Sequence, residues 1–191
     1  MIRQAVLAVA ISMTSMLLSG PLAAGQEAIP SGYRVKPSDV AIPADAKLGE
    51  YQRTTRPFEN WTLICDENLK ARQKVCNVTQ IIEDQAGQVA FSWSLAATKE
   101  GNPYMILRAP PIAKSDAPVS LTFEGRKEPI KIQLDGCNQA VCVGMLPVGP
   151  IMREQISKAA ASVISFPTTD GRTINVTATL KGLAAAVAAI N

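Results

Sequence analysis

The spacing of hydrophobic side chains predicts a chain built mainly of β-strands. The clearest case runs from Val89 to Ala96, where large apolar side chains at every second position alternate with small residues. Successive side chains of a strand point to opposite faces, so a period of two indicates a strand with one buried face. We therefore predict that Trp93 and, by the same pattern, Trp61 are core residues rather than an exposed binding platform. Weaker forms of the pattern predict strands over residues 61–65, 75–82, 105–108, 119–123, 130–134, 141–146, 162–166 and 174–180.

Two short helices are predicted in the C-terminal part of the chain. After Gly149 and Pro150, apolar residues recur at helical spacing as far as about Ala160, and an alanine-rich segment from Gly182 to Ile190 predicts the second helix. Because strands greatly outnumber helices, the sequence predicts a mainly β fold. We expect a single sandwich-like or curled antiparallel β domain, with the two short helices packed against it as caps.

The N-terminus has the order of features found in a secretory signal peptide. Within residues 1–24, Arg3 is followed by an uncharged apolar run from Ala5 to Leu18 and by small residues at Ala23 and Ala24. The run is shorter than the roughly 20 apolar residues that cross a bilayer as a helix, which disfavours a membrane anchor. We therefore expect an exported protein of the periplasm or outer envelope, with no transmembrane segment in the mature chain.

A proline-rich stretch separates the predicted signal peptide from the predicted domain. Residues 25–56 contain several prolines and show little apolar periodicity, and the breaker Pro30-Ser31-Gly32 lies within them. We expect this stretch to be a linker or arm, with a docking arm as the functional alternative. The folded β domain is expected over residues 57–191, which is long enough for one hydrophobic core.

The charge balance gives no reason to expect a nucleic-acid partner. Removing residues 1–24 takes away only Arg3 from the charged set, so Lys+Arg falls from 19 to 18 while Asp+Glu stays at 16, and the net charge falls from +3 to +2. The charges are scattered, apart from a basic stretch from Lys70 to Lys74 that we interpret as a solvated loop. A net charge this small indicates neither nucleic acid nor an anionic membrane surface as a partner.

The chain contains no histidine, which excludes several common kinds of active site. Ser-His-Asp and Cys-His nucleophile systems need an imidazole, as do histidine-ligated zinc, copper and haem sites. Carboxylate-only or Ser-Lys chemistry stays open, but no spacing in the sequence supports either. We therefore expect no enzymatic activity, no catalytic residues, no cofactor and no metal site.

Four cysteines, Cys65, Cys76, Cys137 and Cys142, form an even set in a chain expected to be exported. Such a set in an oxidising compartment indicates two disulfides, and three pairings are possible. Closeness in sequence favours Cys65–Cys76 and Cys137–Cys142, whereas crossed pairing would close longer loops. Neither spacing is Cys-x-x-Cys, so a zinc site or a redox pair is disfavoured.

Several motifs stand in a fixed order over roughly residues 56–191. They are Phe58-x-x-Trp61-x-x-x-Cys65, Cys76, Pro129, Cys137, Cys142, Val163-x-x-Phe166 and Leu180-x-Gly182-Leu183. In order and spacing they resemble the invasion-associated locus B family of exported proteobacterial proteins. That family typically shows Phe-x-x-Trp near its start, two cysteine pairs, and Leu-x-Gly-Phe before the last helix. Here Leu183 stands where that phenylalanine is usual.

The resemblance implies a small exported protein of the periplasm or envelope without a defined enzymatic activity. The family is named for a locus linked to entry of a bacterial pathogen into red blood cells, which implies a role in host-cell invasion and virulence. It supplies no functional residues to carry over by position, apart from the cysteines, whose role is structural.

Three functions are compatible with these observations. The first, which we favour, is an envelope interaction protein that contacts an unknown protein or envelope component. The second is a periplasmic module that binds a small ligand between sheet and helices, and the third is a histidine-free hydrolase. An exposed apolar patch would favour the first, a closed pocket with convergent polar groups the second, and a perturbed lysine or carboxylate in a cleft the third.

Overall fold

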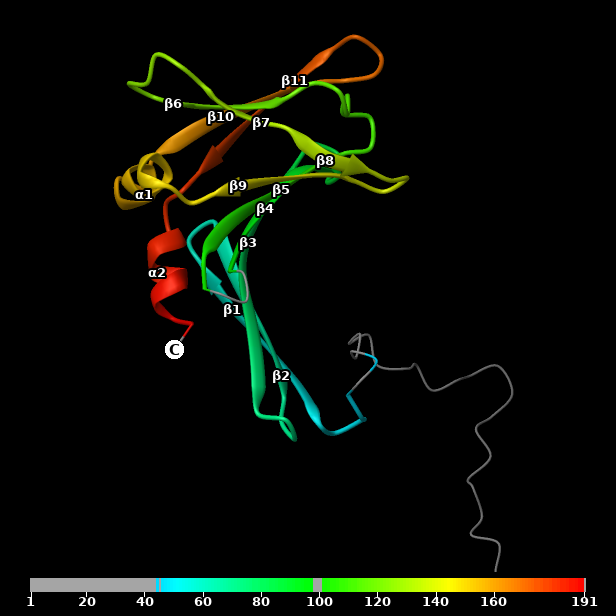
Figure 1. Cartoon of the computed structure of the whole chain (residues 1–191), viewed down its shortest axis with the longest axis vertical. Helices are drawn as coiled ribbons and strands as arrows, with labels where there is room; N and C mark the ends of the chain where they lie inside the picture. The colour runs from blue at the N-terminus through cyan, green and yellow to red at the C-terminus, as the bar shows by residue number, and fades with distance from the viewer. Residues whose placement is uncertain (1–43, 45, 98–100, 191) are drawn as a thin grey trace, which may run out of the picture. The chain divides into compact units, whose positions relative to one another are not determined.

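The computed structural model describes residues 44, 46–97 and 101–190, so the predicted signal peptide over residues 1–24 lies outside the described residues. The described chain forms two antiparallel β-sheets and two short helices (Figure 1). This arrangement confirms the predicted mainly β fold class.

The larger sheet has seven strands in the order β1-β2-β3-β4-β5-β9-β8, and neighbouring strands are antiparallel. Its first five strands follow one another in sequence as a meander, so each pairs with the strand just before it. The strands are β1 (Tyr51–Phe58), β2 (Trp61–Asn68), β3 (Gln73–Glu83), β4 (Val89–Ala97), β5 (Pro103–Ala109), β8 (Leu134–Cys137) and β9 (Cys142–Pro147).

The smaller sheet has four strands in the order β11-β10-β6-β7. It contains β6 (Val119–Phe123), β7 (Ile130–Ile132), β10 (Ala161–Pro167) and β11 (Thr173–Thr179). Helix α1 (Pro150–Ser157) connects β9 to β10, and helix α2 (Leu183–Ala188) ends the described chain beside β1, β2 and β3 (Figure 1). Both helices are shorter than predicted.

The hydrophobic core lies between the inner faces of the two sheets. Trp61 and Trp93 stack there with ring centroids 5.6 Å apart, and Phe91 of the larger sheet contacts Phe166 of the smaller one. Trp93 is fully buried and Trp61 is 2% exposed, which confirms both as core residues. Aromatic pairs of this kind contribute beyond the apolar area that they bury.

Gln80 of β3 is among the polar side chains that are buried, and it lies within this core. Its amide nitrogen donates to the backbone carbonyls of Asn60 and Thr179, at 3.0 and 3.1 Å. Its amide oxygen accepts from the indole N–H of Trp93 at 3.0 Å, and the indole N–H of Trp61 donates to the Thr179 carbonyl. Gln80 therefore connects the tryptophan pair to the end of β11, and with it the larger sheet to the smaller one.

The structure corrects the predicted boundary between arm and domain. Residues 25–43 of the predicted arm lie outside the described residues, but residues 51–56 belong to β1, which pairs with β2 along its whole length. β1 is an edge strand, and all but its first and last residues are exposed. An edge strand that buries so little has no apolar alternation, so the sequence pattern did not reveal it.

The predicted strand over residues 130–134 is two strands in the structure. Ile130 and Ile132 belong to β7 of the smaller sheet, whereas Leu134 begins β8 of the larger one. All three side chains pack against the same core, so the alternation continues through the point where the chain passes between sheets. The backbone carbonyl of Gln133 there lies so close to Gly144 of β9 that a Cβ at Gly144 would be 2.8 Å from it.

Within the described residues, neither helix has the length and apolar character needed to span a bilayer.

Candidate functional site

The four cysteines form two disulfides, each joining neighbouring strands. Cys65 of β2 is bonded to Cys76 of β3, directly opposite it, and Cys137 of β8 is bonded to Cys142 of β9. This is the locally paired arrangement, and it leaves none of the four as a free thiol. Among the described residues there is also no group of three or more acidic or cysteine side chains placed to hold a metal ion.

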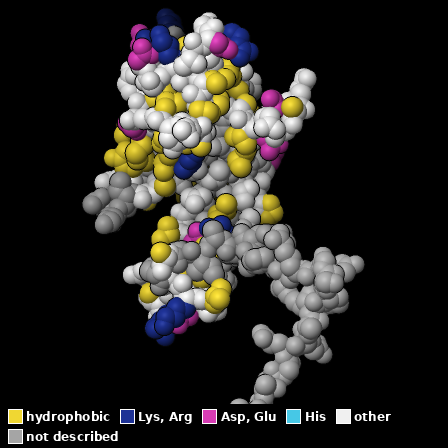
Figure 2. Space-filling model, turned by 90° about the vertical axis from the view of Figure 1, so that its right-hand side faces the viewer, with side chains coloured by type: hydrophobic (Ala, Val, Ile, Leu, Met, Phe, Trp, Pro, Cys, Tyr) yellow, Lys and Arg dark blue, Asp and Glu magenta, His cyan; other side chains and the backbone are white. Residues whose placement is uncertain are grey.

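Within the part of the chain that the structure describes, the seven-stranded sheet has one covered face and one open face. Its inner face carries the tryptophans and the Cys65–Cys76 disulfide, and it is the side on which the smaller sheet and α2 pack. Its outer face is formed by the alternate residues of the same strands. Figure 2 views the molecule from the side opposite α2 and shows hydrophobic side chains grouped among uncharged ones, with most charged side chains toward the margins of the view.

A row of hydrogen-bonded polar side chains crosses this outer face from β3 to β5. The Thr79 hydroxyl donates to the Asn77 amide oxygen at 3.0 Å and lies 2.9 Å from the Ser94 hydroxyl oxygen. The Ser94 hydroxyl in turn accepts from the guanidinium of Arg108 at 2.9 Å. The row exists because the antiparallel register places Thr79 opposite Ser94 and brings Arg108 next to it. We call these four residues the polar row.

Arg108 is the charged end of the polar row. Its guanidinium uses one nitrogen on Ser94, and it forms no ion pair with any carboxylate of the described residues. Ser94 is only 4% exposed, so its hydroxyl holds the guanidinium from within the sheet. The remaining N–H groups of a guanidinium held this way suit a carboxylate or phosphate, which arginine binds with two parallel hydrogen bonds.

Hydrophobic side chains surround the polar row. Val75 is 71% exposed, Ile81 58% and Met145 47%. Part of this face forms a shallow concavity of about 390 Å³ whose lining includes Val75, Ile81, Ile106 and the polar row. Exposed apolar side chains that gather around a few oriented polar groups are typical of protein interaction sites.

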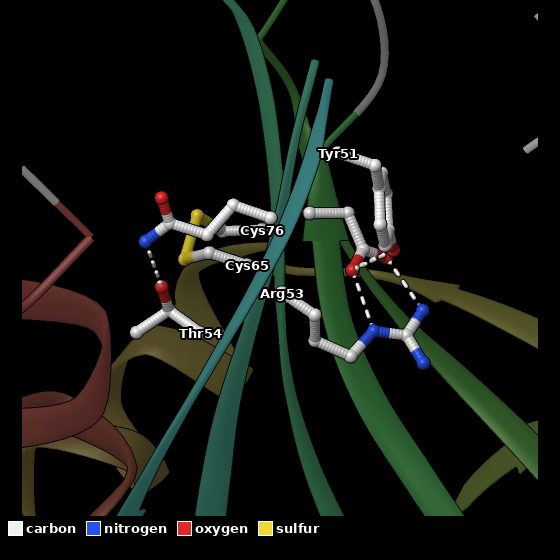
Figure 3. Close-up of polar contacts among 7 residues, drawn as sticks. Tyr51, Arg53, Thr54, Cys65 and Cys76 are labelled. Atoms are coloured by element: carbon white, nitrogen blue, oxygen red, sulfur yellow. Dashed lines mark hydrogen bonds and ion pairs between the residues drawn. A yellow bond between two sulfur atoms is a disulfide. The ribbon is translucent and has the colours of Figure 1, made fainter. Parts of the chain in front are cut away.

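A second polar cluster lies on the same face, where β1 pairs with β2 (Figure 3). The Arg53 guanidinium donates to both carboxylate oxygens of Asp66, at 2.6 and 2.9 Å, and the Tyr51 hydroxyl donates to the same carboxylate. Figure 3 shows Tyr51 and Arg53 on one side of the edge strand, with Thr54 and the disulfide on the other. The Arg53 hydrogen bonds lower the pKa of Asp66, with a smaller contribution from Tyr51, while burial acts in the opposite direction.

The lowered pKa of Asp66 predicts an acid-dependent contribution to stability. A carboxyl group with a lower pKa in the folded state stabilises the fold above its unfolded pKa, and the effect is lost as the pH falls through the folded pKa. We expect thermal unfolding of Asp66→Asn to show a lower midpoint than wild type at pH 6, with the difference disappearing well below pH 4.

Asp135→Asn, which alters an exposed aspartate of β8, provides the matched control for this titration. It should follow the wild-type curve at every pH. A constant difference between wild type and Asp66→Asn down to pH 2 would show that the loss is not electrostatic.

A separate apolar concavity lies on the inner face beside the Cys65–Cys76 disulfide. It measures about 270 Å³, and its lining includes Leu95, Pro103, Val187 and Ile190, with Lys74 as the charged residue. Small-molecule sites usually measure about 300–1,000 Å³ and enclose most of their ligand. This concavity is therefore poorly suited to a small ligand. The outer face is better suited to a protein partner.

The sequence pattern predicts the buried tryptophans and the local cysteine pairing, both of which the structure contains, but it does not predict the polar row. The predicted solvated loop falls at the exposed β2–β3 turn, although Lys74 already belongs to β3. One signal was present: Ser92 and Ser94 alternate with the large residues of β4, which places small polar groups on the opposite face. The contact of Ser94 with Arg108 depends on the register between β4 and β5, which the alternation pattern alone does not give.

The fold and surface together define a small, disulfide-containing β protein with an open, partly apolar sheet face. The family model described as "Invasion associated locus B (IalB) protein" matches residues 61–191, more than half of the chain, and the chain therefore belongs to this family. A search of curated proteins gave no match.

A solved structure supports the fold independently. The crystal structure of invasion associated protein B from Bartonella henselae is similar with a TM-score of 0.61 and 16% sequence identity. The similarity covers 72% of this chain and 95% of that chain. At this identity the likeness concerns the fold alone.

Proposed function

We propose that this protein is a non-enzymatic envelope protein that binds a partner protein through the outer face of its seven-stranded sheet. The observation that carries the proposal is the combination of exposed Val75, Ile81 and Met145 with the hydrogen-bonded polar row that ends at Arg108. Apolar contacts would supply most of the affinity, and the oriented polar groups would set the position of the partner.

The chemistry of the polar row indicates what the partner presents. Arg108 is a held guanidinium without a carboxylate among the described residues, and Ser94 fixes its position. The complementary group is a carboxylate, and the surrounding apolar side chains require an apolar surface around it. The partner is therefore proposed to place an aspartate or glutamate, bordered by hydrophobic residues, against the polar row.

The proposed location is the periplasm or outer envelope. Family membership and the two disulfides are consistent with an exported protein, and the N-terminal sequence has the order of a signal peptide. In this proposal, contact with the partner is how the protein would take part in envelope function or host-cell invasion.

The absence of enzymatic activity is part of the proposal. It is supported by the lack of histidine in the whole chain and by the engagement of all four cysteines in disulfides. These residues are the usual means of activating a nucleophile near neutral pH. Turnover that survives repurification and disappears with one substituted lysine, serine or carboxylate would contradict this part.

Position-dependent cross-linking in the producing cell tests the binding surface. A photoreactive amino acid at Val75 or Ile81 should give a discrete cross-linked product with one protein. The same amino acid at Val163 is the matched control, because Val163 is 43% exposed but belongs to the smaller sheet. The Val75 and Ile81 products should disappear when Arg108 is changed to Gln in the same chain.

The pattern of products decides the outcome. Equal cross-linking from Val163 and from the outer face would mean that the partner does not select this surface. Products that persist unchanged in Arg108→Gln would mean that the polar row does not take part in binding.

A further inference from the structure

We propose that the protein associates with a second copy of itself by antiparallel pairing of β11 with β11, which joins the two small sheets into one. The observation behind this inference is the open edge of the four-stranded sheet, a feature separate from the outer face of the larger sheet. Among the described strands, β11 pairs only with β10, so its other side is the edge of its sheet.

The hydrogen bonds around β11 show which backbone groups face that edge. The N–H of Leu180 donates to the carbonyl of Ala160 at 2.9 Å, in register with the β10–β11 ladder. In an antiparallel ladder the bonding direction alternates, so the even-numbered residues of β11 face β10. Thr173, Asn175 and Thr177 therefore direct their N–H and C=O groups outward, and the structure gives these groups no partner among the described residues.

The end of this edge is closed by side chains, which confirms the direction of the open groups. At Thr179 the backbone carbonyl accepts from the side chains of Trp61 and Gln80, and these come from the larger sheet. Beside Thr177 the edge borders an open concavity of about 380 Å³, which β3 also lines with Ile81, Ile82 and Glu83. This concavity leaves space beside Thr177. Toward Thr173, no described strand pairs with the outer side of β11.

Among the described strands, β11 is the sheet edge without protection against pairing. Charged residues, prolines, bulges and short length are the usual means by which edge strands avoid association. β1 carries Arg53, Arg56 and Pro57, β7 has three residues, and β8 has four with a register shift. The seven residues of β11 include no charged side chain and no proline.

Self-pairing about a two-fold axis at Asn175 gives a complementary register. Thr173 of each copy then lies opposite Thr177 of the other, and Asn175 lies opposite itself, which makes three pairs that each exchange two backbone hydrogen bonds. On the core-facing side, the half-buried Ile174 of one copy lies opposite Val176 of the other. Such β-branched cross-strand pairs are favourable, and no like charges oppose one another.

Charge substitutions at the symmetry centre test this arrangement. We expect sedimentation equilibrium of the purified protein to show a monomer–dimer equilibrium between micromolar and millimolar concentration. Asn175→Lys and Asn175→Asp should each be monomeric, because each charge would oppose its own copy, whereas an equimolar mixture of the two should form a dimer again. Thr55→Lys, which adds a charge to the edge strand β1, is the control and should associate like wild type.

Hydrogen exchange at the backbone amides of β11 tests the proposal on the wild-type protein, without any substitution. Hydrogen exchange at the amides of Thr173, Asn175 and Thr177 should slow at least threefold as wild-type concentration rises through the dimerisation range. A wild-type protein that stays monomeric up to millimolar concentration overturns the proposal and would leave the edge to a strand from another protein. Dimers that persist in both single variants overturn it equally, since they must form elsewhere.

Discussion

Replacing Gly182 with alanine is expected to destabilise the fold by about 2–5 kcal/mol, which combines roughly 1–2 kcal/mol for the left-handed backbone with roughly 1–3 kcal/mol for a forced backbone shift. Gly182 has a φ of 94°, which side-chain-bearing residues rarely adopt. A Cβ at this position would lie 1.9 Å from the backbone carbonyl oxygen of Glu59, in the turn between β1 and β2. Because the obstacle is backbone, it cannot move away as a side-chain end could. The chain before α2 would have to leave its place beside the turn, although Leu180 and Leu183 are both buried in the core.

Gly171→Ala is the matched control for this experiment. Gly171 has a similar φ of 84°, but a Cβ there meets nothing within 4 Å. Its substitution should therefore cost about 1–2 kcal/mol, the penalty for the left-handed conformation alone. Denaturant unfolding of both variants separates strain from steric clash, and an equal cost for the two would mean that Glu59 does not pack against Gly182 as described.

Replacing Gln80 with methionine is expected to cost about 3 kcal/mol or more, despite the similar shape of the two side chains. The substitution removes the acceptor of the Trp93 indole N–H and the donor to the Asn60 carbonyl, and it leaves the Thr179 carbonyl with the Trp61 indole as its remaining side-chain donor. Each buried polar group left without a partner costs about 1–3 kcal/mol. The loss should also separate the two sheets where β11 ends, so the near-ultraviolet circular dichroism of the stacked tryptophans should change with it.

Gln73→Met on the same strand is the control for the Gln80 experiment. Gln73 is exposed at the start of β3, and surface substitutions usually change stability by less than about 0.5 kcal/mol. Denaturant unfolding followed by tryptophan fluorescence compares the two variants directly. If Gln80→Met were as stable as Gln73→Met, the buried amide would not connect the sheets.

The sequence predicted the strands that bury one face and expose the other. It missed a strand that is exposed on both faces. The alternation from Val89 to Ala96 identified β4 and assigned its two faces, because one face packs in the core and the other does not. β1 has no such asymmetry, since six of its eight residues are exposed. Its place is fixed by pairing with β2 and by the Arg53–Asp66 ion pair, neither of which a local pattern can show.

The candidate site was less predictable than the fold. Arg108 and Ser94 lie on different strands, and their contact depends on the β4–β5 register, which sequence periodicity does not give. Gln80 was visible in principle, because it is the one polar residue at a core-facing position between Val78 and Ile82. Its role as a connection between sheets needed the position of β11, which sequence periodicity does not contain.

The affinity of the cross-linked partner for the purified protein tests the central claim, that the outer face of the seven-stranded sheet is the binding surface. Calorimetric titration should show binding at least tenfold weaker for Arg108→Gln than for wild type, equivalent to about 1.4 kcal/mol for the lost charge-assisted hydrogen bonds. Lys131→Gln removes an exposed positive charge from β7 in the smaller sheet and should bind like wild type. Equal affinity for wild type and a fully folded Arg108→Gln, or an equal loss in both variants, would contradict the claim.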